Sequence, residues 1–247
     1  MSTTATPRTE LESKILIEFF RRQHQKWKDR ANGTNPQAQN NVHLFDQNAQ
    51  EYDEWFDQNP AVFESELAAL KELIPKEGQG LEIGAGTGRF SFPLGVQTVV
   101  EPASSMAAIA RKRGLTVHEA FAESLPFKDN SFDFVLMVTV LCFVTDPLQV
   151  LQETRRVLKP GGSVILAFID KETPLGKTYL YSESKYYRFA HLHSAREMMD
   201  LLERAGFKWQ DSRQTLLADP QTLQVPEKPK SGFGKGGFAV FSAQAMK

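Results

Sequence analysis

The stretch that decides the fold is GLEIGAGTG, residues 80–88, in which three glycines alternate with other residues behind a short apolar segment. Glycine lets the backbone turn with a positive φ and lets a ligand lie against bare main chain. A helix that follows such a loop presents free N–H groups and a partial positive charge. The stretch therefore predicts a strand, a loop and a helix that together bind a nucleotide-like ligand with a carboxylate or other negative group.

The glycine spacing separates two classes of nucleotide. Dinucleotide-binding folds use G-x-G-x-x-G, whose third glycine packs the helix on the strand. This chain has G-x-G-x-G, with Glu82 two residues ahead of Gly84. The spacing argues against a dinucleotide, and an ordinary strand-to-helix turn stays open as the alternative at this point.

Apolar strands and helices alternate after the glycine loop. Strands are expected at 81–83, 97–101, 115–119, 132–138 and 163–169, with weaker ones near 208–216 and 236–245. Helices are expected at 104–113, 146–157 and 194–205. Such alternation, with strands that are apolar on both faces, predicts an α/β fold with a doubly wound, mostly parallel sheet.

The N-terminal part differs in composition from the rest. We expect disorder over 1–9, a helix over 10–30 and a flexible linker rich in Asn, Gln and Gly over 31–41. The helix over 10–30 is either an amphipathic helix packed on the domain or a lid or partner-binding helix. Two further helices are expected at 45–56 and 60–73, so residues 1–44 are taken as tail, helix and linker and 45–247 as the main domain.

Composition excludes several classes of protein. The formal net charge of -1 over 247 residues gives no field that would favour nucleic acid or an anionic membrane surface. The single cysteine, Cys142, excludes an internal disulfide framework and a cysteine-based zinc site, and it fits a reducing cytosol. Residues 1–9 have no apolar signal core, and no segment approaches the length of a membrane span. We therefore expect a cytoplasmic protein without a membrane span or a metal.

Ligands of such sheets lie at the carboxyl ends of the strands. Gly84, Ala85 and Gly86 end the first strand, and Glu101 ends the second, 17 positions after Gly84. A carboxylate there can accept two hydrogen bonds from a ribose diol. The alternative for Glu101 is an ordinary surface acid.

Two later strand ends supply further candidates. Main-chain groups of Ala122 and Glu123 could bind a purine edge, with Met106 and Leu125 on either side of the ring, although both apolar residues could equally be core. Val138 and Thr139 end the fourth strand, next to the place where a reactive group would project.

Four motifs resemble one known family in order and spacing. They are LEIGAGTGRF (81–90), VVEPASSM (99–106), AFAESLPFKDNSFDFVLMVTVLCFV (120–144) and ETRRVLKPGGSVILAF (153–168). Together they resemble the class I S-adenosylmethionine (SAM)-dependent methyltransferases, in the branch that includes the ubiquinone and menaquinone biosynthesis enzymes and many small-molecule methyltransferases. The resemblance covers about residues 45–170.

The resemblance implies a seven-stranded Rossmann-like sheet of order 3-2-1-4-5-7-6 with an antiparallel last strand. It implies SAM as the cofactor, with Gly84, Ala85 and Gly86 against its methionine part and Glu101 on its ribose. Met106 is expected on the adenine. Further cofactor-binding residues are expected at Tyr52, which closes over the cofactor in the leading helix, and at Glu82, Ala122, Glu123 and Val138.

The chain departs from the family pattern in two places. The helix after the glycine loop is short, because only 89–94 separate Gly88 from a second turn at Gly95. Phe121 stands where many relatives have an acid before the Ala-Glu pair, so a side-chain bond to the adenine amine is in doubt.

Substrate selectivity is expected from an insertion at about 170–194. It contains four tyrosines (Tyr179, Tyr181, Tyr186 and Tyr187) and two histidines. One of His191, His193 or Tyr187 is expected nearest the acceptor as a catalytic residue. The alternative is a packed cap with solvated or hydrogen-bonded imidazoles. A metal site is not expected, since the two histidines have no evident third ligand.

The sequence favours methyl transfer from SAM to a small molecule. No Asn-Pro-Pro-Tyr-type run follows the fourth strand, which argues against methylation of nucleic-acid bases. The acceptor atom (O, N, S or C) and the oligomeric state stay open. Two alternatives stay open as well. The first is a module that binds SAM or a related nucleoside without methyl transfer and acts in regulation or partner binding through the helix over 10–30. The second, weaker one is an NAD-linked oxidoreductase.

Overall fold

The computed structural model describes residues 36–182 and 184–246. The chain divides into two compact units, Met1–Asn40 and Asn41–Lys247, and every feature below lies in the second, apart from the first residues of one helix. The expected disorder over 1–9 and helix over 10–30 lie outside the described residues.

The second unit contains one sheet with helices on both faces. Its strands are β1 (Gly80–Ile83), β2 (Thr98–Val100), β3 (Thr116–His118), β4 (Phe132–Val138), β5 (Leu158–Ile169), β6 (Phe207–Thr215), β7 (Lys230–Ser231) and β8 (Phe238–Ala245). Its α-helices are α2 (Pro36–Gln47), α3 (Ala49–Gln58), α4 (Pro60–Leu73), α5 (Ser91–Leu94), α6 (Ser104–Lys112), α7 (Pro147–Val157), α8 (Pro174–Leu180) and α9 (Ala195–Arg204). Two short 3-10 helices, Tyr187–Phe189 and Pro220–Thr222, complete it.

The sheet order is β3-β2-β1-β4-β5-β8-β6-β7. The first five strands pair in parallel, and β8 is antiparallel to both β5 and β6. The prediction of a doubly wound, mostly parallel Rossmann-like sheet with an antiparallel last strand is therefore confirmed. The two-residue β7 adds one edge strand to the predicted seven.

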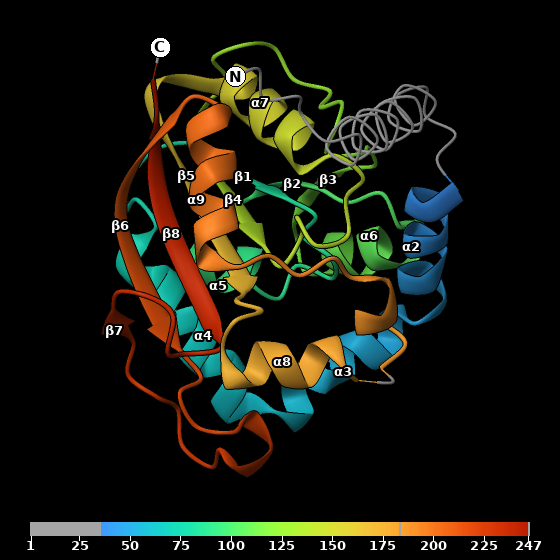
Figure 1. The fold of residues 1–247 in the computed structure, drawn as a ribbon. Helices are drawn as coiled ribbons and strands as arrows, with labels where there is room; N and C mark the ends of the chain where they lie inside the picture. Colours follow the sequence, from blue (N-terminus) through green and yellow to red (C-terminus); the bar gives the residue numbers. More distant parts are fainter. Residues whose placement is uncertain (1–35, 183, 247) are drawn as a thin grey trace, which may run out of the picture. The chain divides into compact units, whose positions relative to one another are not determined.

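The strands alternate their side chains between two apolar clusters. Along β5, Val164 and Leu166 join one cluster, and Ile165 and Ala167 join the other. The first cluster includes the buried side chains of α7 and α9, and the second includes those of α4. Figure 1 shows α9 lying in front of the strands, and the sheet is buried on both faces because each face has its own helices.

Local sequence signals fix where the helices of the first face begin. Asp146 caps α7 by accepting hydrogen bonds from Leu148 N and Gln149 N. Ser194 caps α9 in a capping box with Glu197, as its spacing predicts. Both caps satisfy backbone N–H groups that have no partner inside the helix.

The linker predicted over 31–41 is wrong for 36–41, because α2 begins at Pro36. Proline suits the first helical position, where its missing N–H costs nothing. Tertiary contacts also hold the helix: Asn41 Nδ2 donates to Phe143 O at 2.7 Å, and Phe45 packs edge-on against Phe143. The single helix predicted over 45–56 is divided at Asn48 into α2 and α3.

The helix after the glycine loop has only four residues, Ser91–Leu94. Its N-terminus therefore gives little of the partial positive charge expected from a helix dipole, which needs several aligned peptide units. The backbone N–H groups of the loop are themselves engaged: Gly84 and Ala85 donate to Val100 O, and Gly86 donates to Glu101.

Candidate functional site

The glycine loop follows β1 with two glycines in the left-handed region, Gly84 at φ +67° and Gly86 at φ +56°. A Cβ on Gly84 would lie 2.6 Å from Val140 Cγ2, so the protein's own packing requires this glycine. A Cβ on Gly86 would lie 3.4 Å from Tyr52 Cε1. The Tyr52 ring thus lies next to the bare backbone of Gly86, and its closure over a cofactor stays a prediction.

Glu101 follows β2 and points at the same loop. Its Oε2 accepts the Gly86 N–H at 2.8 Å, and its Oε1 accepts the Ala103 N–H at 2.8 Å. Burial raises the pKa of Glu101 to about 7, although both backbone bonds favour the ionised form. The carboxylate is therefore held in one orientation at the carboxyl end of the sheet.

Glu82 lies within β1 and is 1% exposed. Its carboxylate accepts a hydrogen bond from the Ser91 hydroxyl at the start of α5. Burial raises the pKa of Glu82 to about 8, the Ser91 bond opposes this rise, and repulsion from Glu101 adds to it. Two acids thus lie next to the loop without a basic partner among the described residues.

Tyr52, on α3, lies among other aromatic rings. Its ring is 5.3 Å from Phe56 and 6.3 Å from Tyr186, both edge-on. Burial raises the pKa of Tyr52, and the charges of Glu66 and Glu101 raise it further. The hydroxyl therefore stays protonated and can donate a hydrogen bond.

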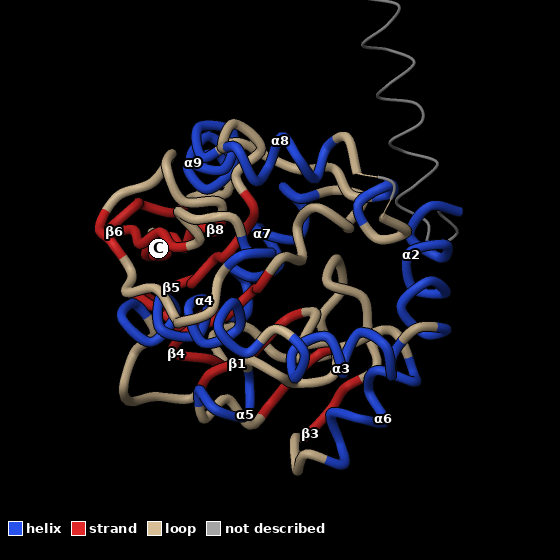
Figure 2. The backbone as a smooth tube through the Cα atoms, turned by 90° about the horizontal axis from the view of Figure 1, so that it is seen from below, coloured by secondary structure: helices blue, strands red, loops and turns tan. Residues whose placement is uncertain are grey.

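An ion-paired network fixes α3 to the loop. Asp53 accepts from Arg89 Nε at 2.9 Å and from Arg113 Nη2 at 2.7 Å. Arg113 also donates to the carbonyl of Thr87 in the loop. Burial alone would raise the pKa of Asp53, but the bonds from Arg113 and Arg89 outweigh it and lower the pKa to about 2. Figure 2 shows α6 beside β3, and α3 packs against α6.

The other predicted cofactor-binding residues line the same strand ends. Met106, Ala122 and Val138 are buried. Met106 belongs to a small cluster with Ala49, against which Tyr52 packs. The Glu123 carboxylate accepts from Thr145 N, and its carbonyl accepts from the Gln149 side chain, each at 3.3 Å.

Thr139 directly follows β4 and has a φ of +54°. A β-branched residue is a genuine outlier in this region. Its N–H donates to Ala167 O at 2.8 Å, and its carbonyl accepts a bond from Cys142 Sγ at 3.2 Å. These bonds hold the backbone in its unusual conformation at the end of the strand.

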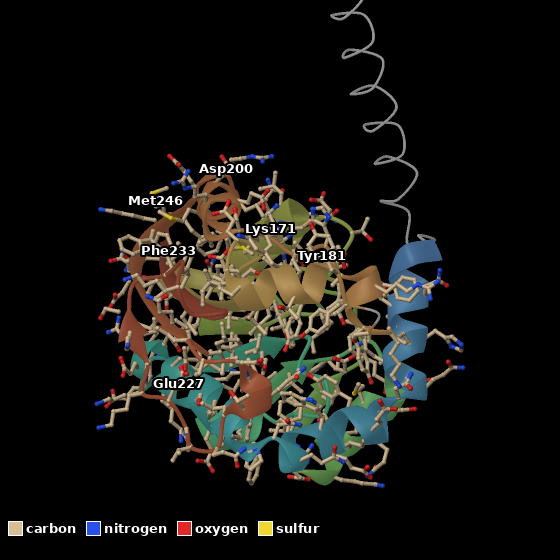
Figure 3. All side chains as sticks on the ribbon, turned by 60° about the horizontal axis from the view of Figure 1, so that its bottom comes forward. Lys171, Tyr181, Asp200, Glu227, Phe233 and Met246 are labelled. Atoms are coloured by element: carbon tan, nitrogen blue, oxygen red, sulfur yellow. The ribbon has the colours of Figure 1, made fainter. Side chains whose placement is uncertain are left out.

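The tyrosines of the insertion divide into inner and outer ones. Tyr187 stacks on Tyr179 at 4.0 Å between ring centroids, and its hydroxyl donates to that of Tyr179. Tyr186 stacks on Phe45 at 5.5 Å. Tyr181, which follows α8 and is labelled in Figure 3, is 88% exposed, so it does not belong to the inner set.

The two histidines follow these tyrosines along the insertion. Their ring centroids are 5.0 Å apart, and His191 is exposed, with its backbone N–H on Cys142 O at 2.7 Å. Burial, with repulsion from His191, lowers the pKa of His193 to about 4, and its neighbours are Glu197 and the Leu141 backbone. Of the three residues predicted nearest the acceptor, the structure thus brings only Tyr187 next to the other inner tyrosines.

Sequence reasoning missed Glu66, on α4. It is 8% exposed, and it makes no hydrogen bond or ion pair with any residue that the structure describes. Burial raises its pKa to about 8. Its charge also raises the pKa values of Tyr52, Tyr179 and Tyr187, so it lies within electrostatic range of all three hydroxyls.

The site suits a positively charged ligand. No Lys or Arg within 36–182 or 184–246 forms an ion pair with Glu82 or Glu101, the two acids beside the glycine loop. Buried carboxylates without a counter-charge are costly. SAM carries a sulfonium and an ammonium, a ribose diol for Glu101, and a flat ring, so the residues present fit this cofactor.

Comparison with known proteins agrees with this fit. Residues 81–166 match the model of a methyltransferase domain. The crystal structure of a SAM-dependent methyltransferase from Thermotoga maritima, described as a possible histamine N-methyltransferase, has 45% sequence identity and a TM-score of 0.80, covering 83% of this chain and 99% of that one. The chain belongs to the class I SAM-dependent methyltransferases.

Two further proteins are similar over shorter or equal spans. An uncharacterised protein of Methanocaldococcus jannaschii is 44% identical over 207 residues, which is 83% of this chain and 100% of that protein. A ubiquinone/menaquinone biosynthesis C-methyltransferase of Hahella chejuensis is 30% identical over 162 residues, covering 51% of this methyltransferase and 65% of that one.

In the described part of the methyltransferase, no helix is both long and apolar enough to cross a membrane. Within the same residues, no three His, Cys, Asp or Glu side chains come together as a metal site.

Proposed function

We propose that this methyltransferase transfers the methyl group of SAM to a small-molecule acceptor. The observation that carries the proposal is Glu101, whose two oxygens are fixed by Gly86 N–H and Ala103 N–H beside a glycine loop that Tyr52 covers. This arrangement presents one oriented carboxylate to a ribose next to bare main chain.

Each predicted cofactor-binding residue has a role in the proposal. Glu101 binds the ribose diol, and Gly84, Ala85 and Gly86 lie against the methionine part. Met106 packs on the adenine, with the main chain of Ala122 and Glu123 at its edge. Tyr52 closes over the cofactor, Glu82 is an acid whose ionised form a bound cation would favour, and Val138 lies near the methyl group.

The sulfonium supplies an already activated methyl group, so the protein's own residues mainly orient and exclude water. Tyr52, Tyr179 and Tyr187 provide an apolar surround with hydroxyls that burial keeps protonated. We assign Tyr187 to the contact with the acceptor. The predicted roles of His191 and His193 stay predictions.

A small acceptor is supported by the aromatic insertion and by the Thermotoga maritima relative, whose suggested acceptor is a small amine. No strongly basic surface is implied by the net charge of -1, which disfavours nucleic acid as the acceptor. A cytoplasmic location is proposed because the chain has a single cysteine and residues 1–9 have no apolar signal core.

Calorimetry with SAM and S-adenosylhomocysteine tests cofactor binding, and a methyl-transfer assay over a small-molecule panel tests the activity. We expect saturable binding of both compounds and turnover of at least one acceptor. Binding without any turnover would favour a binding module, and absence of binding would refute the proposal. Glu77→Gln, at an exposed acid before β1, is the control variant.

A further inference from the structure

Glu66 is a buried acid that cofactor binding does not explain. It lies on the buried side of α4, one helical turn from Val62 and Leu70, which belong to the apolar cluster under β5 and β8. Tyr52, Tyr179 and Tyr187 pack against that same cluster. A carboxylate that is 8% exposed and has no hydrogen-bond or ion-pair partner among the described residues has lost much of its hydration, which is costly.

The charge of Glu66 acts on tyrosines beside the loop and in the insertion. Tyr52 covers Gly86, and its hydroxyl is influenced by Glu66 as well as by Glu101 and Glu82. The charge of Glu66 also raises the pKa values of Tyr179 and Tyr187, which belong to the insertion and pack on the same apolar cluster as α4. Glu66 therefore lies within electrostatic range of the part of the chain that the proposed function assigns to the acceptor.

We propose that Glu66 and the rings of Tyr52, Tyr179 and Tyr187 bind a positively charged nitrogen of the acceptor. Ammonium groups are bound by a carboxylate that neutralises their charge and by aromatic faces that attract it. The substrate class is therefore a small amine that is protonated at neutral pH. This inference rests on the proposed function, since it names the acceptor of the same reaction.

The charge state of Glu66 gives a signature for this binding. Without a cation the raised pKa, about 8, leaves the carboxyl mostly protonated at pH 7. A bound ammonium favours the ionised form. Amine binding therefore releases a proton from Glu66, and a purely structural carboxyl would release none.

The test uses the full chain saturated with S-adenosylhomocysteine and three probes: 2-phenylethylamine, histamine and the neutral alcohol 2-phenylethanol. We expect at least one amine to bind about 10-fold or more tightly than the alcohol, a preference worth about 1.4 kcal/mol. In Glu66→Gln this preference falls below about 3-fold, which is under 1 kcal/mol. Glu64→Gln, at an exposed acid of the same helix, keeps it.

Calorimetry at pH 7 in two buffers of different ionisation enthalpy measures the proton release. The wild type is expected to release a fraction of a proton per bound amine, and Glu66→Gln none. S-adenosylhomocysteine affinity is expected to stay within about 2-fold in Glu66→Gln, which also shows that the variant is folded.

Three outcomes would overturn the inference. The first is that neither amine binds better than the alcohol to wild type that still binds S-adenosylhomocysteine; the proposed function then survives. The second is an unchanged amine preference in Glu66→Gln. The third is a variant that loses S-adenosylhomocysteine binding and keeps amine binding, which would assign Glu66 to the cofactor. Failure of the proposed function itself appears separately, as wild type that binds no cofactor.

Discussion

Four acidic side chains, two near each face of the sheet, differ in whether they have a basic partner. Near α7 and α9, Glu153 pairs with Arg156 at 2.7 Å and Glu197 pairs with Lys171 at 2.6 Å, and both acids have lowered pKa values. On the α4 and α5 face, Glu66 and Glu82 have no basic partner among the described residues, and burial raises both pKa values. The first face is arranged for stability, whereas the second keeps costly groups that a bound cation would compensate.

Truncation of a buried side chain on the first face should lower the stability of the fold and leave S-adenosylhomocysteine binding unchanged. Leu151, on α7, is fully buried in the apolar cluster there. We expect Leu151→Ala to lower the free energy of unfolding by about 2–5 kcal/mol through lost burial and a cavity. Denaturant titration measures this loss. An altered S-adenosylhomocysteine affinity in the folded variant would contradict the division between the faces.

An isosteric change beside the loop should weaken cofactor binding and leave the stability of the fold largely unchanged. Glu101→Gln places an amide N–H2 against one of two N–H donors that now lie 2.8 Å from the carboxylate oxygens. We expect S-adenosylhomocysteine to bind about 30–100-fold more weakly, a loss of about 2–3 kcal/mol. Calorimetry measures the affinity, with Glu77→Gln as the control. Unchanged affinity would remove Glu101 from the proposed ribose contact.

The pH dependence of stability sharpens the comparison. Glu66 titrates near pH 8 in the folded chain and near 4.5 in the unfolded one, so the folded state binds the extra proton between these values. Stability from this group is therefore full below about pH 4.5 and is lost as the pH rises to about 8.

Glu66→Gln removes this loss. Between pH 5 and pH 8, the free energy of unfolding of the wild type should fall by at least about 1 kcal/mol more than that of the variant, since one pKa unit corresponds to about 1.4 kcal/mol. Denaturant titrations at the two pH values give the difference. Parallel pH profiles for wild type, Glu66→Gln and Glu64→Gln would show that the Glu66 carboxyl is not shifted.

The smallest effect is expected at the surface of the site. Lys185 Nζ donates to Asn48 Oδ1 and Glu51 Oε2, both at 2.6 Å, but Lys185 and Glu51 are largely exposed. Lys185→Met should change the free energy of unfolding by less than about 1 kcal/mol, and less still at high salt. A double-mutant cycle with Glu51→Gln measures the coupling. Coupling above about 2 kcal/mol would mean that this contact is structurally important.

Sequence patterns predicted the fold and the loop because both depend on local signals. Alternating strands and helices, the glycine spacing and the caps at Asp146 and Ser194 each follow from neighbouring residues. Glu101 could be found because it ends a strand at a fixed interval after the loop.

Glu66 could not be found in this way. Its helix carries the other acids Glu64 and Glu72 and apolar residues at Phe63 and Leu67, so Glu66 looks like part of a solvated face. It is buried because distant segments cover α4: Glu227 N, for example, donates to Ser65 Oγ at 2.8 Å. The start of α2 was missed for the same reason, since its contacts with Phe143 lie about 100 positions away in sequence.

Thr139 carries a consequence of its own. A left-handed conformation costs an L-residue roughly 1–2 kcal/mol, and the chain keeps a threonine there where glycine would relax the backbone. Strain of this kind persists when it aims a group that must not move. The methyltransferase thus stores conformational energy at the end of β4. Thr139→Gly should raise the free energy of unfolding and leave the backbone at the end of β4 less precisely positioned.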